Sequence, residues 1–237
     1  MAADSERPGV ALKDRQAWVF DLDNTLYPAE CDLFAQIDQR MTDFVARFLR
    51  LPREEARATQ KRYYAEHGTT LTGLMTMHGM EPDEFLAHVH EIDLSPLPKT
   101  PDLADAIAAL PGRKFVYTNG SRGHARRVTD YMGLGQVFDG SFAIEDSAFM
   151  PKPNQASYDA FIAQFEIDPS LAVFFEDLAR NLAPAQAMGF ATVLVQSDKD
   201  WSHEPASARP AGIGDDLPPH IDYVTRDLTQ FIRSIVQ

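Results

Sequence analysis

Two carboxylates stand two residues apart at the end of a short apolar run. In "WVFDLDNTLYP", residues 18–28, Asp21 follows the apolar residues directly and Asp23 comes two positions later. Because side chains alternate along an extended chain, both carboxylates return to the same side. One carboxylate can then act as a covalent nucleophile while the other donates or accepts a proton. Taken alone, however, such a pair more often marks an ordinary strand end followed by a turn.

Polar residues also follow two later apolar runs. Thr118 comes directly after "KFVY", at the start of a "TNGS" turn, and Glu176 and Asp177 come directly after "LAVFF". In open α/β sheets, ligands bind in a crevice at the carboxyl ends of the strands, where residues distant in sequence meet. We therefore expect these three residues to converge on Asp21 and Asp23.

Four carboxylates in one crevice would repel one another and raise some of their pKa values unless positive charge intervenes. Mg²⁺ is a natural solution, because it takes one or two carboxylates, waters and a phosphate oxygen. Lys152, between two prolines in "MPKPN", adds a further positive charge. The Thr118 hydroxyl and the free backbone N–H groups of the turn through Asn119 and Gly120 would form an anion site. An anion site beside a metal-binding acid cluster suits a phosphoryl group.

Strands that end at one edge are needed to position these residues. Four runs are short, apolar and rich in β-branched or aromatic residues, which is typical of buried strands; they lie at 17–20, 114–117, 171–175 and 192–195. Helical patterns lie between them, at 101–110, 121–132, 154–165 and 179–188. The alternation predicts an α/β fold, a Rossmann-like three-layer core with a parallel sheet. The C-terminal part predicts a loop at 203–220, an edge strand at 221–224 and a helix ending near Val236.

One region interrupts the alternation of strands and helices. From residue 29 to residue 98 the apolar residues recur at helical spacing, with helical segments around 53–66, 71–79 and 82–92 after a first one that contains Phe34. We expect a helical cap domain over 29–98, inserted after the first strand. It would divide the core domain into residues 1–28 and 99–237.

Composition narrows the classes of partner and compartment. The 237 residues include 22 Lys and Arg against 35 Asp and Glu, a net charge of -13. This charge disfavours nucleic acid and anionic membranes as partners. No run reaches the roughly 18 apolar residues of a membrane span, and the polar N-terminal stretch has no apolar signal region. The single cysteine, Cys31, cannot form an intramolecular disulfide, so we expect a cytoplasmic protein.

The four motifs together resemble the haloacid dehalogenase superfamily of phosphohydrolases. They occur in the family order: "DLDNT", "TNG", the Lys of "PKP", and "ED" with Asn181 downstream. Longer stretches, among them "FDLDNTLYP", "TNGSRGHARRV" and "EDLARNLAPA", resemble the pyrimidine 5'-nucleotidase branch, which has Asn and "TLYP" at this point of the first motif. The resemblance implies a Mg²⁺-dependent phosphomonoesterase with a helical cap, acting on a small phosphorylated metabolite: a nucleoside 5'-monophosphate such as UMP or CMP.

The resemblance also implies catalytic roles. Asp21 would be the nucleophile that forms an aspartyl-phosphate. Asp23 would protonate the leaving alkoxide and then activate water. Thr118, with Asn119 and Gly120 of the same turn, would bind the phosphoryl oxygens. Lys152, also substrate-binding, would balance the charge on the phosphate and the nucleophile.

The metal ligands implied by the resemblance come from the first and fourth motifs. Mg²⁺ would bind Asp21, the carbonyl group of Asp23 and Asp177, with Glu176 bound directly or through water. Many relatives have two aspartates in the fourth motif, where this chain has Glu176 first. The arrangement of the ligands therefore stays open, while Asn181 is expected to orient the metal loop.

Of three further features, His124 and the stretch 69–80 have two interpretations each. His124 lies one helical turn after Ser121 and could approach the phosphate, or serve helix packing or capping. Arg126 and Arg127 are most simply a solvated helix face. The stretch "TTLTGLMTMHGM", residues 69–80, could line a base-binding pocket, although Met at helical spacing is more often core.

Other functions also have to be weighed. A phosphatase for a sugar phosphate or phosphoglycolate is the near alternative, because the cap sets the substrate. A dehalogenase is disfavoured, because halide departure does not need the acid that Asp23 offers. A phospho-Asp signalling or binding protein without turnover shares the Asp, Thr, Lys and Mg²⁺, but a receiver domain presents its acid pair before the phosphoacceptor. A calcium-binding loop would need Gly and Glu where this chain has Leu26 and Asp32.

Overall fold

A six-stranded parallel sheet forms the centre of the molecule in the part of the chain that the computed structural model describes, residues 11–201, 209–210 and 217–237. The strand order is β3-β2-β1-β4-β5-β6, and every neighbouring pair is parallel. The strands are β1 (Ala17–Phe20), β2 (Arg113–Tyr117), β3 (Gly140–Phe142), β4 (Ala172–Glu176), β5 (Ala191–Val195) and β6 (Tyr223–Thr225). The predicted parallel α/β sheet is confirmed.

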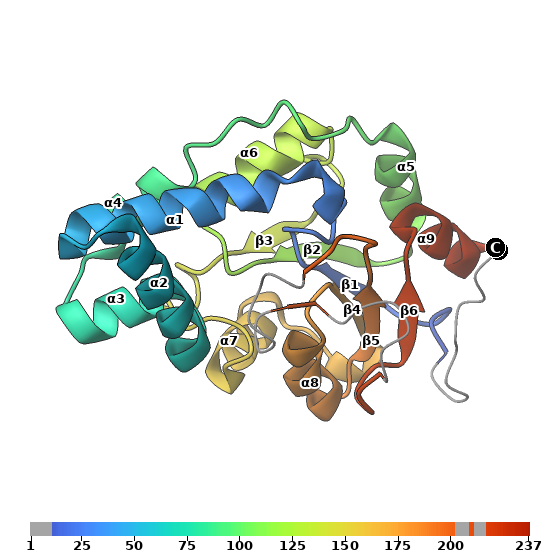
Figure 1. Cartoon of the computed structure of the whole chain (residues 1–237). Coiled ribbons are helices and arrows are strands. Elements are labelled where there is room, and N and C mark those ends of the chain that lie inside the picture. Colours follow the sequence, from blue (N-terminus) through green and yellow to red (C-terminus); the bar gives the residue numbers. More distant parts are fainter. Residues whose placement is uncertain (1–10, 202–208, 211–216) are drawn as a thin grey trace.

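Helices cover both faces of the sheet (Figure 1). One face carries α5 (Pro101–Ala109), α6 (Arg122–Met132) and α9 (Leu228–Val236), and the other carries α7 (Gln155–Phe165) and α8 (Ala179–Met188). The alternation within β1 explains the two layers, because Trp18 and Phe20 pack in the first apolar cluster and Val19 in the second. These layers are the predicted three-layer core.

The strand order places β1 in the centre of the sheet, between β2 and β4. Phe20 at the end of β1 lies beside Val116 on one side and Phe175 on the other. Connections run to opposite sides from this point, as at the switch point where parallel α/β sheets bind ligands. Any residue that directly follows β1 is therefore placed at this crevice.

The segment between β1 and α5 is helical in its described structure. It contains a short 3-10 turn (Ala29–Cys31) and then α1 (Leu33–Leu49), α2 (Arg53–His67), α3 (Thr70–His78) and α4 (Pro82–Val89). Residues 29–98 are called the helical cap below. The cap has its own apolar contacts, among them the rings of Phe44 in α1 and Phe85 in α4, whose centroids are 5.1 Å apart. Thr69 caps α3 by accepting a hydrogen bond from the N–H of Thr72.

The main differences from the predicted strands lie at the edges of the sheet, and among the helices α4 ends at Val89, before the predicted residue 92. β3 has no apolar run to reveal it, because Gly140 and Ser141 make up two of its three residues. The edge strand expected at 221–224 begins at Tyr223, because the Asp222 carboxylate accepts from the backbone N–H of Thr192. Most of the loop expected at 203–220 lies outside the described residues; 209–210 and 217–220 contain no helix or strand. None of the described helices is long and apolar enough to cross a membrane.

Candidate active site

The chain turns sharply after β1 and holds both acids of the first motif at the sheet edge. The Asp21 N–H still donates to the Phe175 carbonyl oxygen (2.9 Å), so Asp21 stays in register with β4. The next residues form a tight turn in which the N–H of Leu26 donates to the Leu22 carbonyl oxygen (3.1 Å). Asn24 in this turn has a φ of 62°, a left-handed conformation that Asn tolerates better than most residues.

Lys152 lies at the centre of the site. Its Nζ donates three hydrogen bonds: to Asp21 Oδ1 (2.6 Å), to the Tyr117 carbonyl oxygen (2.8 Å) and to Glu176 Oε1 (3.0 Å). Burial alone would lower the pKa of Lys152, but the charges of Asp21 and Glu176 raise it above its usual value. Lys152 is therefore a charged link between the first and fourth motifs, and it brings to the acid cluster the positive charge noted in the sequence.

Asp21, Glu176 and Asp177 form a buried acid cluster, in which one carboxylate oxygen of each lies within 4.8 Å of the others. Burial raises the pKa of Asp21 to about 7, with Glu176 adding to the rise and Lys152 opposing it. The pKa of Asp177 is also well above its usual range, because of burial and then the charges of Glu176 and Asp21. One lysine does not balance three buried carboxylates, so the cluster has the charge deficit that a divalent cation would fill.

The chemistry of the surrounding donors fits a hard cation. All three charged groups offer oxygen, the ligand atom that Mg²⁺ prefers. The side-chain oxygens of Asn24 and Asn181 are buried and have no hydrogen-bond partner among the described residues. Buried polar atoms are normally satisfied, so two such oxygens beside an acid cluster are consistent with a missing electropositive partner such as a hydrated cation.

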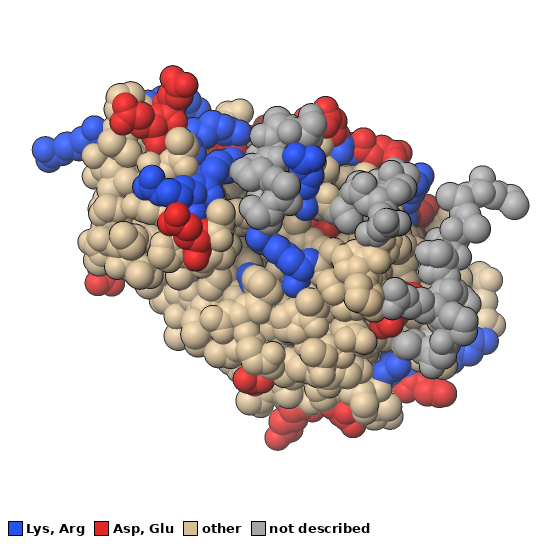
Figure 2. Space-filling model, turned by 60° about the horizontal axis from the view of Figure 1, so that its bottom comes forward, with Lys and Arg blue, Asp and Glu red and all other residues tan. Residues whose placement is uncertain are grey.

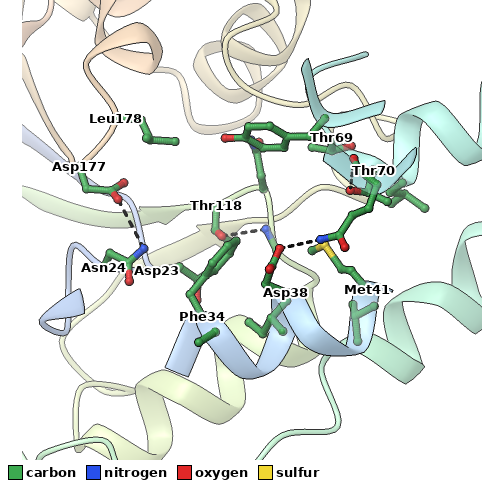
Figure 3. Close-up of a pocket in the computed structure, with 18 of the residues that line it drawn as sticks. Asp23, Asn24, Phe34, Asp38, Met41, Thr69, Thr70, Thr118, Asp177 and Leu178 are labelled. Atoms are coloured by element: carbon green, nitrogen blue, oxygen red, sulfur yellow. Dashed lines mark hydrogen bonds between the residues drawn. The ribbon is translucent and has the colours of Figure 1, made fainter. Parts of the chain in front are cut away.

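Glu176 is held more firmly than the other two acids. Its Oε1 accepts from Lys152 Nζ (3.0 Å) and from Asn181 Nδ2, and its Oε2 accepts from the Leu178 N–H (2.6 Å). Asn181 thus fixes a carboxylate of the fourth motif, in line with its expected orienting role. Asp177 has a lighter restraint, a long contact of 3.5 Å between its Oδ2 and Asn24 Nδ2 (Figure 3).

The turn after β2, residues 118–121, differs from its prediction because one of its backbone N–H groups is already hydrogen-bonded. The Gly120 N–H donates to Thr118 Oγ1 (2.9 Å), so this N–H is not free as expected (Figure 3). Asn119 clamps the loop of Lys152, since its Oδ1 accepts from the Lys152 N–H (2.8 Å) and its Nδ2 donates to the Lys152 carbonyl oxygen (3.2 Å). A Cβ on Gly120 would lie 3.1 Å from the His124 ring and 3.2 Å from Thr118 Oγ1. The close packing therefore favours glycine at this position.

Asp23 receives two hydrogen bonds, from residues to which the motifs gave no catalytic role. His124 Nε2 lies 2.8 Å from Asp23 Oδ1, and the Tyr27 hydroxyl donates to the same oxygen (2.6 Å). Burial alone would raise the pKa of Asp23, but the charge and hydrogen bond of His124 and the bond from Tyr27 lower it. His124 was a sequence candidate with two interpretations, whereas Tyr27 was missed, although it stands only four residues after Asp23.

A cavity of about 340 Å³ leads from the acid cluster into the helical cap. Figure 3 shows Phe34, Asp38 and Met41 projecting from α1 along one side of it, opposite Thr69 and Thr70. The i, i+4, i+7 spacing of the three α1 residues puts them on one helical face. Apolar side chains make up much of the wall in the cap: Phe34, Ile37, Met41, Leu71, Phe85, Leu86 and Val89.

A polar pair interrupts this apolar wall. Gln60 Nε2 donates to Asp38 Oδ1 (2.6 Å), and the Thr42 hydroxyl donates to Gln60 Oε1. Lys61 and Arg57 also donate to the Asp38 carboxylate, at 2.8 and 2.9 Å. Although burial alone would raise the pKa of Asp38, these two cations lower it below its usual value. Sequence reasoning missed this pair.

The methionines of 69–80 do not line the cavity, so of the two interpretations of this stretch the base-binding one does not hold for them. Thr69, Thr70 and Leu71 line the cavity, whereas none of the three methionines of the stretch does so among the described residues. Met77 is 58% exposed and Met80 is buried in the core. The cavity therefore meets only the start of α3, where the chain enters the helix.

Charge is unevenly distributed over the surface. Figure 2 shows Lys and Arg side chains gathered toward one side and the centre of the face it presents, although the net charge is -13. Arg57, Lys61 and Lys199 are basic residues among those lining the cavity. Net charge alone does not describe this face, and the exclusion of nucleic acid stays a prediction.

Comparison with known proteins defines the class. Residues 16–189 match the family model of the haloacid dehalogenase-like hydrolases. The chain therefore belongs to the haloacid dehalogenase-like hydrolase family. It is 27% identical over 209 residues to phosphate metabolism protein 8 of Saccharomyces cerevisiae, an alignment that covers 80% of this chain and 64% of that protein. The match thus spans less than two thirds of this relative.

Solved structures share the fold. A HAD phosphatase from Thermococcus onnurineus is 18% identical and has a TM-score of 0.62, covering 93% of this chain and 97% of that chain. An L-2-haloacid dehalogenase from Xanthobacter autotrophicus is 19% identical and has a TM-score of 0.57, covering 93% and 98%. The similar folds include both phosphatase and dehalogenase, so the reaction has to be inferred from the site of this chain.

Proposed function

We propose that this protein is a Mg²⁺-dependent phosphomonoesterase that hydrolyses nucleoside 5'-monophosphates, with UMP and CMP as preferred substrates. The observation that carries the proposal is the meeting of Asp21, Asp23 and Lys152 at one end of a single cavity, beside an acid cluster suited to a cation. Membership of the hydrolase family and similarity to a HAD phosphatase support this reaction. The resemblance of the motifs to the pyrimidine 5'-nucleotidase branch supports the choice of nucleotide.

The metal would be held by Asp21, Asp177 and the carbonyl group of Asp23. Glu176 would act through a water molecule, because both of its oxygens already accept hydrogen bonds from the protein. When bound, Mg²⁺ would offset the charge of the carboxylates and of the phosphate and polarise the phosphoryl group. Burial raises the pKa of Asp21 to about 7, and a neighbouring cation would lower it; this supports the proposed metal, since a protonated carboxyl is a poor nucleophile.

In the first half of the reaction, an oxygen of Asp21 attacks phosphorus. A bond forms between this oxygen and phosphorus while the bond from phosphorus to the ester oxygen breaks. Because the pKa of Asp23 is lowered before substrate binds, Asp23 takes up a proton as the phosphate dianion binds, since the added negative charge raises that pKa. Asp23 then gives this proton to the departing oxygen and releases the nucleoside as an alcohol. Lys152 holds Asp21 at 2.6 Å and stabilises its ionised form, and the turn at Thr118 binds the phosphoryl oxygens.

In the second half, the aspartyl-phosphate is hydrolysed. Asp23, now a carboxylate, removes a proton from a water molecule that attacks phosphorus. The bond between phosphorus and Asp21 breaks, inorganic phosphate leaves, and both acids return to their starting states. Asp23 therefore needs one orientation that serves both the leaving oxygen and the incoming water.

The wall of the cavity supports a nucleobase over a sugar as the leaving group. Phe34, Ile37 and Met41 present an apolar surface, on which the face of a planar base can pack. Sugar hydroxyls buried against that surface would lose hydrogen bonds to water, at a cost of about 1–3 kcal/mol for each unsatisfied group. Gln60 and Asp38 offer hydrogen-bonding groups where the edge of a base could reach them.

An assay of phosphate release tests the proposal. The panel contains UMP, CMP, AMP, GMP, sugar phosphates, phosphoglycolate and p-nitrophenyl phosphate, each with Mg²⁺ and with a chelator. We expect the highest kcat/KM for UMP and CMP, and loss of activity in chelator. A wide margin in favour of a sugar phosphate or phosphoglycolate would contradict the choice of nucleotide. Halide release from 2-chloropropionate without Mg²⁺, or a stable phosphoprotein without turnover, would contradict the phosphomonoesterase itself.

A further inference from the structure

The Asp23 carboxylate is held by one of its two oxygens. His124 Nε2 and the Tyr27 hydroxyl both contact Oδ1, at 2.8 and 2.6 Å. No other hydrogen bond reaches this carboxylate from the part of the chain that the structure describes, so Oδ2 has no such partner there. The two oxygens are therefore not equivalent: Oδ1 is fixed by two donors, and Oδ2 is left for another group.

Oδ2 points toward the turn expected to bind phosphate. A Cβ placed on Gly120 would lie 3.6 Å from Asp23 Oδ2 and 3.2 Å from Thr118 Oγ1. Oδ2 and the Thr118 hydroxyl are thus close to the same glycine. An oxygen in this position can exchange a proton with a group bound at the turn, whereas Oδ1 is blocked by its two donors.

His124 is itself held by a residue of the helical cap. The rings of His124 and His90 are stacked, with centroids 4.4 Å apart and an interplanar angle of 15°. His90 Nδ1 lies 3.0 Å from Ser121 Oγ, the oxygen that also accepts from the His124 N–H. Arg127 donates to the His90 carbonyl oxygen (2.8 Å), which ties the end of α4 to α6. A continuous set of contacts therefore joins the cap to Asp23.

From these contacts we infer that His124 and Tyr27 are positioning residues for proton transfer by Asp23, and that His90 lets the helical cap take part in that positioning. The inference rests on the proposed phosphomonoesterase function. Two donors on Oδ1 hold the carboxylate in the one orientation that presents Oδ2 to the leaving oxygen and then to water. Catalytic groups need such support, because a small misplacement of a reacting group lowers the rate strongly.

Leaving-group dependence distinguishes positioning from packing. A nucleoside 5'-monophosphate has an alkoxide leaving group that needs a proton, whereas p-nitrophenolate leaves readily without one. His124→Ala should lower kcat for the nucleotide about 100-fold, a loss within the range that general acid–base catalysis contributes. The loss in kcat for the aryl ester should be about ten times smaller, that is, about tenfold. KM should change little. Tyr27→Phe should show the same pattern, and so should His90→Ala to a smaller extent.

Matched variants complete the test. His124→Gln keeps a donor near the position of Nε2 and should recover much of the kcat that His124→Ala loses. His90→Phe keeps the stacked ring and should have a higher kcat for the nucleotide than His90→Ala. Arg126→Ala changes an exposed residue of the same helix and should leave both substrates unaffected. Equal losses on both esters in His124→Ala, or no rescue by Gln, would overturn the inference, because a packing defect would act in this way.

A second measurement needs no turnover, so it separates this inference from the proposed function. In ¹⁵N spectra of the histidine side chains, the His124 signal is identified by its loss in His124→Gln. Its Nε2–H should shift in Asp23→Ala, where the acceptor is absent, and should stay unchanged in Arg126→Ala. An unchanged signal in Asp23→Ala would overturn the inference, whatever ester the wild-type protein hydrolyses. A shifted signal with no hydrolysis of any phosphomonoester would overturn only the proposed function.

Discussion

The two ends of the cavity differ in charge balance, and the pKa values of Asp21 and Asp38 are shifted in opposite directions. At the strand ends, Asp21 is buried with two further acids and one lysine, and its pKa rises to about 7. At the end in the helical cap, Asp38 lies in an apolar wall, yet Lys61 and Arg57 keep its pKa below the usual range. At the first end one lysine faces three carboxylates, whereas at the second end two cations face one carboxylate. The difference teaches that the acid cluster at the sheet has an excess of negative charge, while the cap supplies a largely apolar surface whose one acid is fully paired.

Removal of the nucleophile should have the largest effect. Asp21→Asn should lower phosphate release about 10⁴-fold or more, the scale seen when a covalent nucleophile is lost. Because the cap wall is unchanged, binding of the nucleotide should persist, which calorimetry with Mg²⁺ and UMP measures. Arg126→Ala is the control. Full activity in Asp21→Asn would show that the reaction does not depend on the acids at the strand ends, and the contrast with a binding surface in the cap would fail.

The second-largest effect is expected from removal of the buried lysine, Lys152, and it should be a loss of folding stability. Lys152→Met keeps much of the side-chain volume but leaves Asp21 and Glu176 without their cation, and breaking a buried ion pair costs about 3–5 kcal/mol. Urea unfolding should show this loss in chelator and a smaller loss in saturating Mg²⁺, which supplies positive charge to the same acids. Equal losses in both conditions would show that the acid cluster binds no cation.

Asp21 and Asp38, one at each end of the cavity, should contribute to the pH dependence of stability with opposite signs. In chelator, Asp21 has a folded pKa of about 7 against 3.8 when unfolded, so its contribution is present below about pH 4 and is lost as the pH rises toward 7. Asp38 has a lowered folded pKa, so its contribution is present above 3.8 and is lost as the pH falls below that value. Unfolding free energies measured from pH 3 to 8 test both signs.

Single variants assign these two pH limbs. Asp21→Asn should reduce the neutral limb, to which Asp177 also contributes, and Asp38→Asn should reduce the acid limb, to which Asp23 also contributes. Mg²⁺ should add more stability at pH 8 than at pH 5, because protons compete with the metal for the same carboxylates. The opposite assignment of the limbs would overturn the comparison between the two ends.

A change in the cap wall should have the smallest effect and should alter selectivity alone. Gln60→Ala removes the amide that Asp38 and Thr42 orient, and should lower kcat/KM for UMP and CMP about tenfold, since a lost substrate contact of this kind is worth about 1–3 kcal/mol. Activity on p-nitrophenyl phosphate should not change. Met77→Ala, exposed and outside the cavity, is the matched control. A uniform loss on both substrates would assign Gln60 to folding.

The same comparison explains what could be predicted from the sequence. The convergence of Asp21, Thr118 and Glu176 could be predicted, because parallel strands bring their carboxyl ends to one edge and the apolar runs reveal where the strands end. The part of the cavity wall that the cap supplies could not be predicted, because Asp38 and Gln60 come from different helices and meet only through helix packing. His124 was a candidate without a partner, since nothing local indicates that its ring reaches Asp23, 101 residues away in sequence.

Trapping of the covalent intermediate tests the central claim most directly. Asp23→Asn with p-nitrophenyl phosphate and Mg²⁺ should still form the aspartyl-phosphate, because this leaving group needs no proton, but should hydrolyse it slowly. We predict a burst of one p-nitrophenolate per active site, and phosphate on the peptide that contains Asp21 after acid quench. A linear time course with no burst, or phosphate attached to any other residue, would contradict the account.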